Sequence, residues 1–294
     1  MAFEKIPSGY PGVDEVFDYI RMGDNVVWQV SALEEYRLFA EAFAKQALKD
    51  GRNLIYMHYA RHESMFSPQP GLKVFEFDPM LGFEPFTVDI YNRITEEGEG
   101  AFYIFDCLSE LQVAWHTDQM MGNFFRVTCP YLHELDTVAY FPIMRGRHSF
   151  ETTASIRDTT QVLVDVYTSD SAVYIHTLKA LDRDSMNIYL PHVSRSGGPF
   201  LPLDGGVALS RYYKLLDDIS AHTQDQNLDS HDRFFALAKL DFGRGSFRDE
   251  TERKILESMM SKDPHVQKLI HQLFEPKDYF TLRDRMIGSG AIGG

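Results

Sequence analysis

The chain has 294 residues, of which 44% are hydrophobic and 24% charged, a composition typical of a folded globular protein. Its 43 acidic and 29 basic side chains give a formal net charge of −14, which disfavours nucleic acid and anionic lipid as partners. No apolar run reaches the roughly 18 residues of a membrane helix, and the first residues lack the pattern of a signal peptide. We therefore expect a cytoplasmic protein with no membrane partner.

Short apolar runs alternate with amphipathic stretches from residue 25 to about 180. This alternation predicts an α/β fold, with βαβ units around a mainly parallel sheet that helices flank. The predicted strands are residues 25–30, 53–59, 73–77, 101–105, 137–144 and 161–167, and the predicted helices are 36–49, 83–97, 118–135 and 150–159. The last strand and residues 172–180 predict a hairpin at the edge of the sheet.

The composition changes after the predicted sheet domain, which we assign to residues 1–193. Residues 194–206 are rich in Gly, Pro and Ser and predict a linker. Residues 207–286 have helical spacing and predict a helical extension, followed by a glycine-rich tail at 287–294. Glycines of this tail match G-x-G-x-x-G, but no strand precedes them, so the match does not predict a dinucleotide site.

The turn after the first predicted strand is where many nucleotide-binding proteins hold phosphate. Its residues are Ser31, Ala32, Leu33, Glu34 and Glu35, with no Gly and no Lys among them. A phosphate loop uses Gly for close backbone approach and Lys for the terminal phosphates, whereas two carboxylates repel a triphosphate. The sequence therefore predicts a degenerate phosphate loop.

Polar residues also follow other predicted strands. Asp106 directly follows an apolar run, as a Walker B carboxylate does, although it could instead cap a turn through Ser109. Ligands of parallel sheets bind beyond the carboxyl ends of the strands. A candidate anion or ligand site at these ends comprises Arg61, His62, Arg145, Arg147 and His148. The alternative is that these residues are ordinary polar side chains of solvent-exposed loops.

The sequence predicts no metal site and no catalytic residue. His58 and His62 are four positions apart, but His58 lies in a predicted strand, where this spacing does not bring two ligands together. Cys107 and Cys129 lie in apolar surroundings and predict buried, reduced thiols. We expect no resident cofactor in this chain.

Residues 6–191 resemble a KaiC-type member of the RecA-like ATPase superfamily. The resemblance rests on the opening PSGYPGVDE at 7–15, on RMGDNV at 21–26 and on FDCLSEL at 105–111, which is similar to the Walker B segment. It implies a RecA/KaiC-like fold with Asp106 at the Walker B position and a homo-oligomer as a possible assembly. The chain departs from the family at the phosphate loop and at Tyr59 and Ala60, where the family has an acidic pair, so the resemblance implies a pseudo-ATPase.

The whole chain also resembles the region that precedes the ATP-grasp domain in some phosphoenolpyruvate synthase or pyruvate, phosphate dikinase-like proteins. Residues 23–30, 107–115 and 121–132 carry this resemblance, and the tail 287–294 is similar to the start of the ATP-grasp domain. It implies a non-catalytic regulatory or assembly module of an ATP-dependent pyruvate phosphotransferase. The catalytic domains, with their ATP and Mg²⁺, would be its partners. Two alternatives are a KaiC-like ATP-binding protein or ATPase with an altered loop, and a sensor of small anions or metabolites at the strand tips.

Overall fold

The computed structural model describes residues 4–169, 172–183, 187–206, 208–209, 212–213 and 215–216. The chain divides into two compact units, Met1–Pro202 and Leu203–Gly294. The described residues of the predicted extension, 208–209, 212–213 and 215–216, are helical. The remainder of that prediction and the glycine-rich tail at 287–294 lie outside the described residues.

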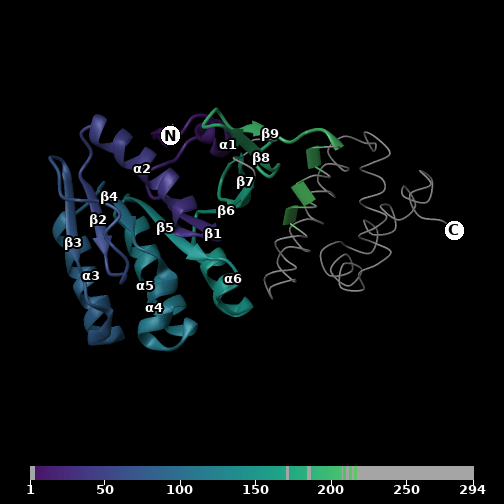
Figure 1. Cartoon of the computed structure of the whole chain (residues 1–294). Helices are drawn as coiled ribbons and strands as arrows, with labels where there is room; N and C mark the ends of the chain where they lie inside the picture. The colour runs from purple at the N-terminus through teal and green to yellow at the C-terminus, as the bar shows by residue number, and fades with distance from the viewer. Residues whose placement is uncertain are drawn as a thin grey trace. The chain divides into compact units, whose positions relative to one another are not determined.

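A nine-stranded sheet forms the centre of the first unit (Figure 1). Its strands are β1 Asn25–Val30, β2 Leu54–His58, β3 Leu72–Glu76, β4 Phe102–Phe105, β5 Val138–Met144, β6 Val162–Ser169, β7 Ala172–Ala180, β8 His192–Arg195 and β9 Leu201–Pro202. Their order is β3-β2-β4-β5-β1-β6-β7-β8-β9. The strands from β3 to β6 in this order run parallel, and β7, β8 and β9 join by antiparallel pairing.

Helices cover both faces of the sheet, as Figure 1 shows. They are α1 Val13–Phe17, α2 Leu33–Lys49, η1 Pro79–Leu81, α3 Phe83–Glu97, α4 Leu108–Trp115, α5 Asp118–Glu134 and α6 Phe150–Thr159. α1 and α2 pack on one face, and α3, α4, α5 and α6 pack on the other. The prediction of an α/β fold with a mainly parallel, helix-flanked sheet is confirmed. Among the described residues, no helix combines the length and apolar character that a membrane span requires.

Alternating strand residues build two separate hydrophobic cores. Trp28 of β1 faces α2 and stacks on Phe39 with ring centroids 4.2 Å apart. On the same face, Phe43 of α2 stacks on Tyr140 of β5, also at 4.2 Å. α2 presents these rings because its apolar residues recur every three or four positions, which places them along one side of a helix.

Two predictions at the borders of the sheet are wrong. The hairpin of β6 and β7 forms, but β8 and β9 extend the sheet beyond it, so β7 is not an edge strand. β8 and β9 also overlap the predicted linker 194–206, and the first unit continues to Pro202. Short strands in a Gly- and Pro-rich stretch have too little periodicity to be recognised. β9 forms this edge of the sheet, and the strand predicted at 73–77 forms the opposite edge, as β3.

The strand order reverses beside β1. From β1 the chain crosses to β2 on one side, whereas β6 lies on the other side of β1. Open α/β sheets bind ligands where the strand order reverses in this way. Ser31 after β1, Asp106 after β4 and Arg145 after β5 all lie at this end of the sheet.

Candidate functional site

The turn between β1 and α2 contains only Ser31 and Ala32, because α2 begins at Leu33 rather than at the predicted residue 36. Leu33, Glu34 and Glu35 therefore belong to the first turn of the helix, where acidic side chains interact favourably with the helix dipole. The turn is too short to wrap around a phosphate group.

The carboxylate of Glu35 binds the backbone of this turn. Glu35 Oε2 accepts hydrogen bonds from the N–H groups of Ser31 at 2.7 Å and Ala32 at 3.3 Å. Glu35 is 9% exposed. A bound phosphate at a helix N-terminus uses such backbone N–H groups. The side chain of Glu35 thus holds the position that a phosphate would need.

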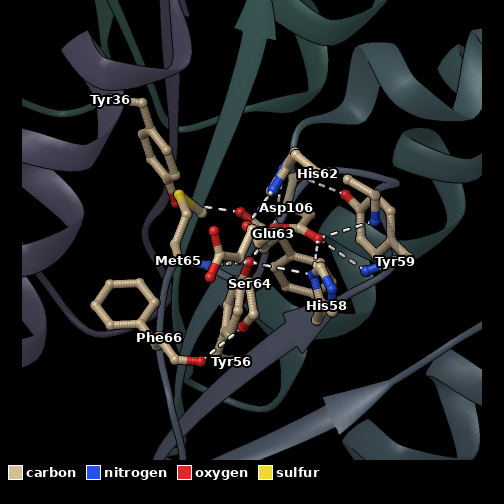
Figure 2. A network of polar contacts seen from close by, with 12 residues as sticks. Tyr36, Tyr56, His58, Tyr59, His62, Glu63, Ser64, Met65, Phe66 and Asp106 are labelled. Atoms are coloured by element: carbon tan, nitrogen blue, oxygen red, sulfur yellow. Dashed lines mark hydrogen bonds and ion pairs between the residues drawn. The ribbon is translucent and has the colours of Figure 1, made fainter.

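A second carboxylate, Asp106, is fully buried and surrounded by hydrogen-bond donors (Figure 2). Its Oδ2 accepts from His58 Nδ1 at 2.6 Å and from the backbone N–H groups of Tyr59 at 2.8 Å and Ala60 at 2.9 Å. Its Oδ1 accepts from the Tyr56 hydroxyl, and His62 Nε2 lies 3.6 Å away. We call these six residues the Asp106 cluster.

The Asp106 cluster keeps its carboxylate ionised. Burial alone would raise the pKa of Asp106, but the hydrogen bonds from His58, Tyr56 and the two backbone N–H groups outweigh burial, so the net pKa is lowered. An ionised carboxylate only accepts, so His58 Nδ1 carries the proton in this bond. The hydrogen bond to Asp106 in turn raises the pKa of His58.

The pairing of His58 with Asp106 predicts a pH dependence. We expect the imidazole of His58 to titrate above its ordinary pKa of 6.5 in the folded protein, as measured by NMR. Because the folded pKa is the higher one, this pair contributes fully below the unfolded pKa, and its contribution is lost as pH rises through the folded pKa. Denaturant unfolding at several pH values should show this loss in the wild type and not in His58→Gln. Parallel curves for the two proteins would contradict the prediction.

The loop between β2 and β3 fills the space beside the Asp106 cluster. Its residues Met65 and Phe66 are buried and belong to the core on the α2 side of the sheet. The ring of Phe66 meets Tyr56 edge to face at 5.2 Å, and the Met65 N–H donates to the Tyr56 hydroxyl at 3.4 Å. The loop is therefore tied to the sheet by both apolar and polar contacts.

Arg145, predicted in an anion site, is instead buried in an ion pair. Its Nη1 lies 2.6 Å from Asp165 Oδ1, and both side chains are at most 4% exposed. Arg145 also donates to the Tyr167 hydroxyl at 2.8 Å and to the carbonyls of Gln29 and Val166 at 3.3 and 2.9 Å. This guanidinium lies across the end of β1, where protein groups bind it in place of an anion.

The remaining predicted tip residues take part in different interactions. His62 lies at the Asp106 cluster, whereas exposed Arg61 contacts Met80 Sδ through Nη2 at 3.4 Å. His148 Nε2 is hydrogen-bonded to Ser109 Oγ at 2.6 Å, and burial lowers the pKa of His148 to about 4, so it is neutral at pH 7. Arg147 is exposed. The structure therefore does not unite the five residues in one anion site.

Sequence reasoning missed the partners of Asp106. His58 and His62 were not expected to converge, but β2 ends at His58 and the following turn places both rings at Asp106, with ring centroids 5.9 Å apart. The proposed cap through Ser109 is also wrong, because Cys107 is the N-cap residue of α4 and the Asp106 carboxylate binds residues 56–60 instead. Polar residues directly before and after the end of β2 were the signal available. Cys107 and Cys129 are buried free thiols, as predicted.

The Asp106 cluster offers few groups for binding a metal ion or a ligand. Asp106 Oδ2 already accepts three hydrogen bonds and Oδ1 accepts one, so most of the acceptor positions of this carboxylate are taken by protein donors. Among the described residues, no group of three or more His, Cys, Asp or Glu side chains forms a metal site. No family model matches this chain, and no curated protein is significantly similar to it.

Proposed function

We propose that the first unit is a RecA/KaiC-like domain that does not bind nucleotide, and that it acts as a non-catalytic regulatory or assembly module. One observation carries the proposal: the polar groups at the carboxyl ends of β1, β4 and β5 are bound by other groups of the protein. The Glu35 carboxylate accepts from the backbone N–H groups after β1, and the donors of the Asp106 cluster bind the carboxylate after β4. Arg145 donates to the carbonyl of Gln29 at the end of β1.

Nucleotide binding would have to undo these interactions. A triphosphate needs the N–H groups that Glu35 holds, and it would meet the negative charges of Glu34 and Glu35 without a nearby Lys. Leaving a displaced carboxylate without its partners costs about 1 to 3 kcal/mol or more for each buried group. This cost favours the pseudo-ATPase over the alternative of an ATPase with an altered loop.

The sensor alternative has less support. Its strongest cation, Arg145, is buried in an ion pair, and His148 is neutral at pH 7 because burial lowers its pKa to about 4. The resemblance to the region before an ATP-grasp domain supports a phosphoenolpyruvate synthase-like phosphotransferase as the parent enzyme. In that assembly ATP and Mg²⁺ belong to the catalytic domains, which are the proposed partners.

Calorimetric titration with ATP and Mg²⁺ tests the loss of nucleotide binding. We expect no binding tighter than a dissociation constant of about 100 µM. A tighter complex that is lost in a folded Asp106→Asn variant would support the ATPase alternative. Glu35→Gln is the matched variant at the turn between β1 and α2. It should likewise fail to bind ATP, because the turn remains too short.

The assembly role needs a separate test. The chain should co-elute in gel filtration with the catalytic domains of a phosphoenolpyruvate synthase-like protein and change their rate of ATP-dependent pyruvate phosphorylation. Absence of both effects would contradict the proposed role, whatever the nucleotide result.

A further inference from the structure

A polar groove of 460 Å³ lies between α5 and α6, and its lining includes no residue of the Asp106 cluster. Its volume is within the range of small-ligand sites. Gly122 is the only residue of the lining without a polar side chain. An apolar ligand would therefore gain little from entering this groove, and its occupant should be polar.

One wall of the groove is fixed by a hydrogen bond between the two helices and by a second one within the first turn of α6. Asp118 Oδ2 accepts from the Ser149 N–H at 2.6 Å, and Ser149 Oγ donates to Thr152 Oγ1 at 3.1 Å. Gly122 permits the close approach of the helices, because a Cβ at this position would lie 3.2 Å from Thr152 Cγ2. The two N-termini thus lie side by side, and the groove is formed before any ligand binds.

Five other side chains of the lining are available to a ligand. Gln119, Asn123 and Arg126 follow the i, i+4, i+7 spacing of one face of α5, and Glu151 and Ser155 follow the i, i+4 spacing on α6. Within the described residues, none of these five side chains makes a hydrogen bond or an ion pair. The groove therefore offers amides, a hydroxyl and both signs of charge.

The charges are separated along the groove. Asp118 and Glu151 lie in the first turns of α5 and α6, whereas Arg126 is eight residues further along α5. Eight residues of α-helix span about 12 Å. A ligand that matches this pattern has a cationic group at one end, an anionic group at the other and hydrogen-bonding groups between them.

We propose that the groove binds a short extended peptide of about three residues with free termini, since three extended residues span about 10 Å. Its ammonium group binds Glu151, at the end of the groove where Asp118 lies, and its carboxylate binds Arg126. The side-chain amides of Gln119 and Asn123 bond to the peptide backbone. Small or polar side chains fit best, because the lining has no apolar pocket. This site is independent of the proposed loss of nucleotide binding.

Calorimetric titration with triglycine tests the site directly. We expect a dissociation constant below about 1 mM. The same peptide with an acetylated amino end, or with an amidated carboxyl end, should bind at least about tenfold more weakly, since each cap removes one charge-assisted contact. No binding of triglycine, or equal binding of the capped peptides, would overturn the proposal.

Substitutions then assign the two ends of the groove. Arg126→Gln should weaken triglycine binding at least about tenfold and abolish the preference for a free carboxylate. Glu151→Gln should reduce the preference for a free amino end. Both residues are exposed, so neither change threatens folding. Arg37→Gln, an exposed position on α2, is the control and should bind like the wild type. Unchanged binding by both groove variants would overturn the assignment.

Discussion

Replacing Asp106 with alanine is expected to lower the free energy of unfolding by about 3 to 5 kcal/mol, because it leaves several buried hydrogen-bond donors without an acceptor. The Tyr56 hydroxyl, His58 Nδ1 and the N–H groups of Tyr59 and Ala60 would all lose their acceptor. Urea denaturation followed by circular dichroism measures this change.

Two further variants make the measurement specific. Asp106→Asn keeps one acceptor oxygen but turns an amide donor toward other donors, so its effect should lie between those of the wild type and alanine. Asp89→Ala removes an exposed carboxylate from α3 and should change stability by less than about 0.5 kcal/mol. Equal effects of Asp106→Ala and Asp89→Ala would mean that the Asp106 cluster does not stabilise the fold.

Replacing Arg145 with methionine is expected to cost about 3 to 5 kcal/mol, since it leaves the Asp165 carboxylate buried without its cation. The ion pair is 2.6 Å long, with side chains 4% and 2% exposed, so water cannot compensate for its loss. The hydroxyl of Tyr167, which donates to Asp165 Oδ2 at 2.7 Å, is too weak a substitute for a full charge.

The double variant Arg145→Met with Asp165→Leu separates charge from packing. An apolar pair of similar volume removes the uncompensated carboxylate, so the double variant should be more stable than Arg145→Met alone. Arg147→Met, two positions along the chain and exposed, is the control and should lie within about 0.5 kcal/mol of the wild type. A double variant as unstable as the sum of the single variants would contradict this account.

The strands and helices of the fold could be predicted from the sequence because the patterns that indicate them are local. β1 is predicted at its true bounds, and so are α3 and α6, since apolar runs and helical periodicity span only neighbouring residues. The start of α2 was predicted three residues late because Leu33, Glu34 and Glu35 precede the aromatic periodicity that marks the helix. That small difference removes the loop in which a phosphate would be held.

The candidate site could be predicted from the sequence only in part. The missing Gly and Lys after β1 and the position of Asp106 at a strand end are properties of the sequence alone. The side-chain and backbone groups that bind Asp106 come from residues 56–60, about fifty positions earlier in the chain. No local pattern encodes this pairing, because it depends on the parallel register that places Met57 of β2 beside Phe105 of β4.

Local sequence patterns are enough to specify the parallel α/β architecture and a turn after β1 that has acidic residues in place of Gly and Lys. The partners of the charged groups follow from packing: Glu35 binds the backbone of this turn, Asp106 accepts hydrogen bonds from His58 and Tyr56, and Arg145 is buried against Asp165. The physical reason is that a charged side chain at a strand end can face either solvent or the interior. Sheet register and burial select between these two environments, and both arise only when distant segments pack together.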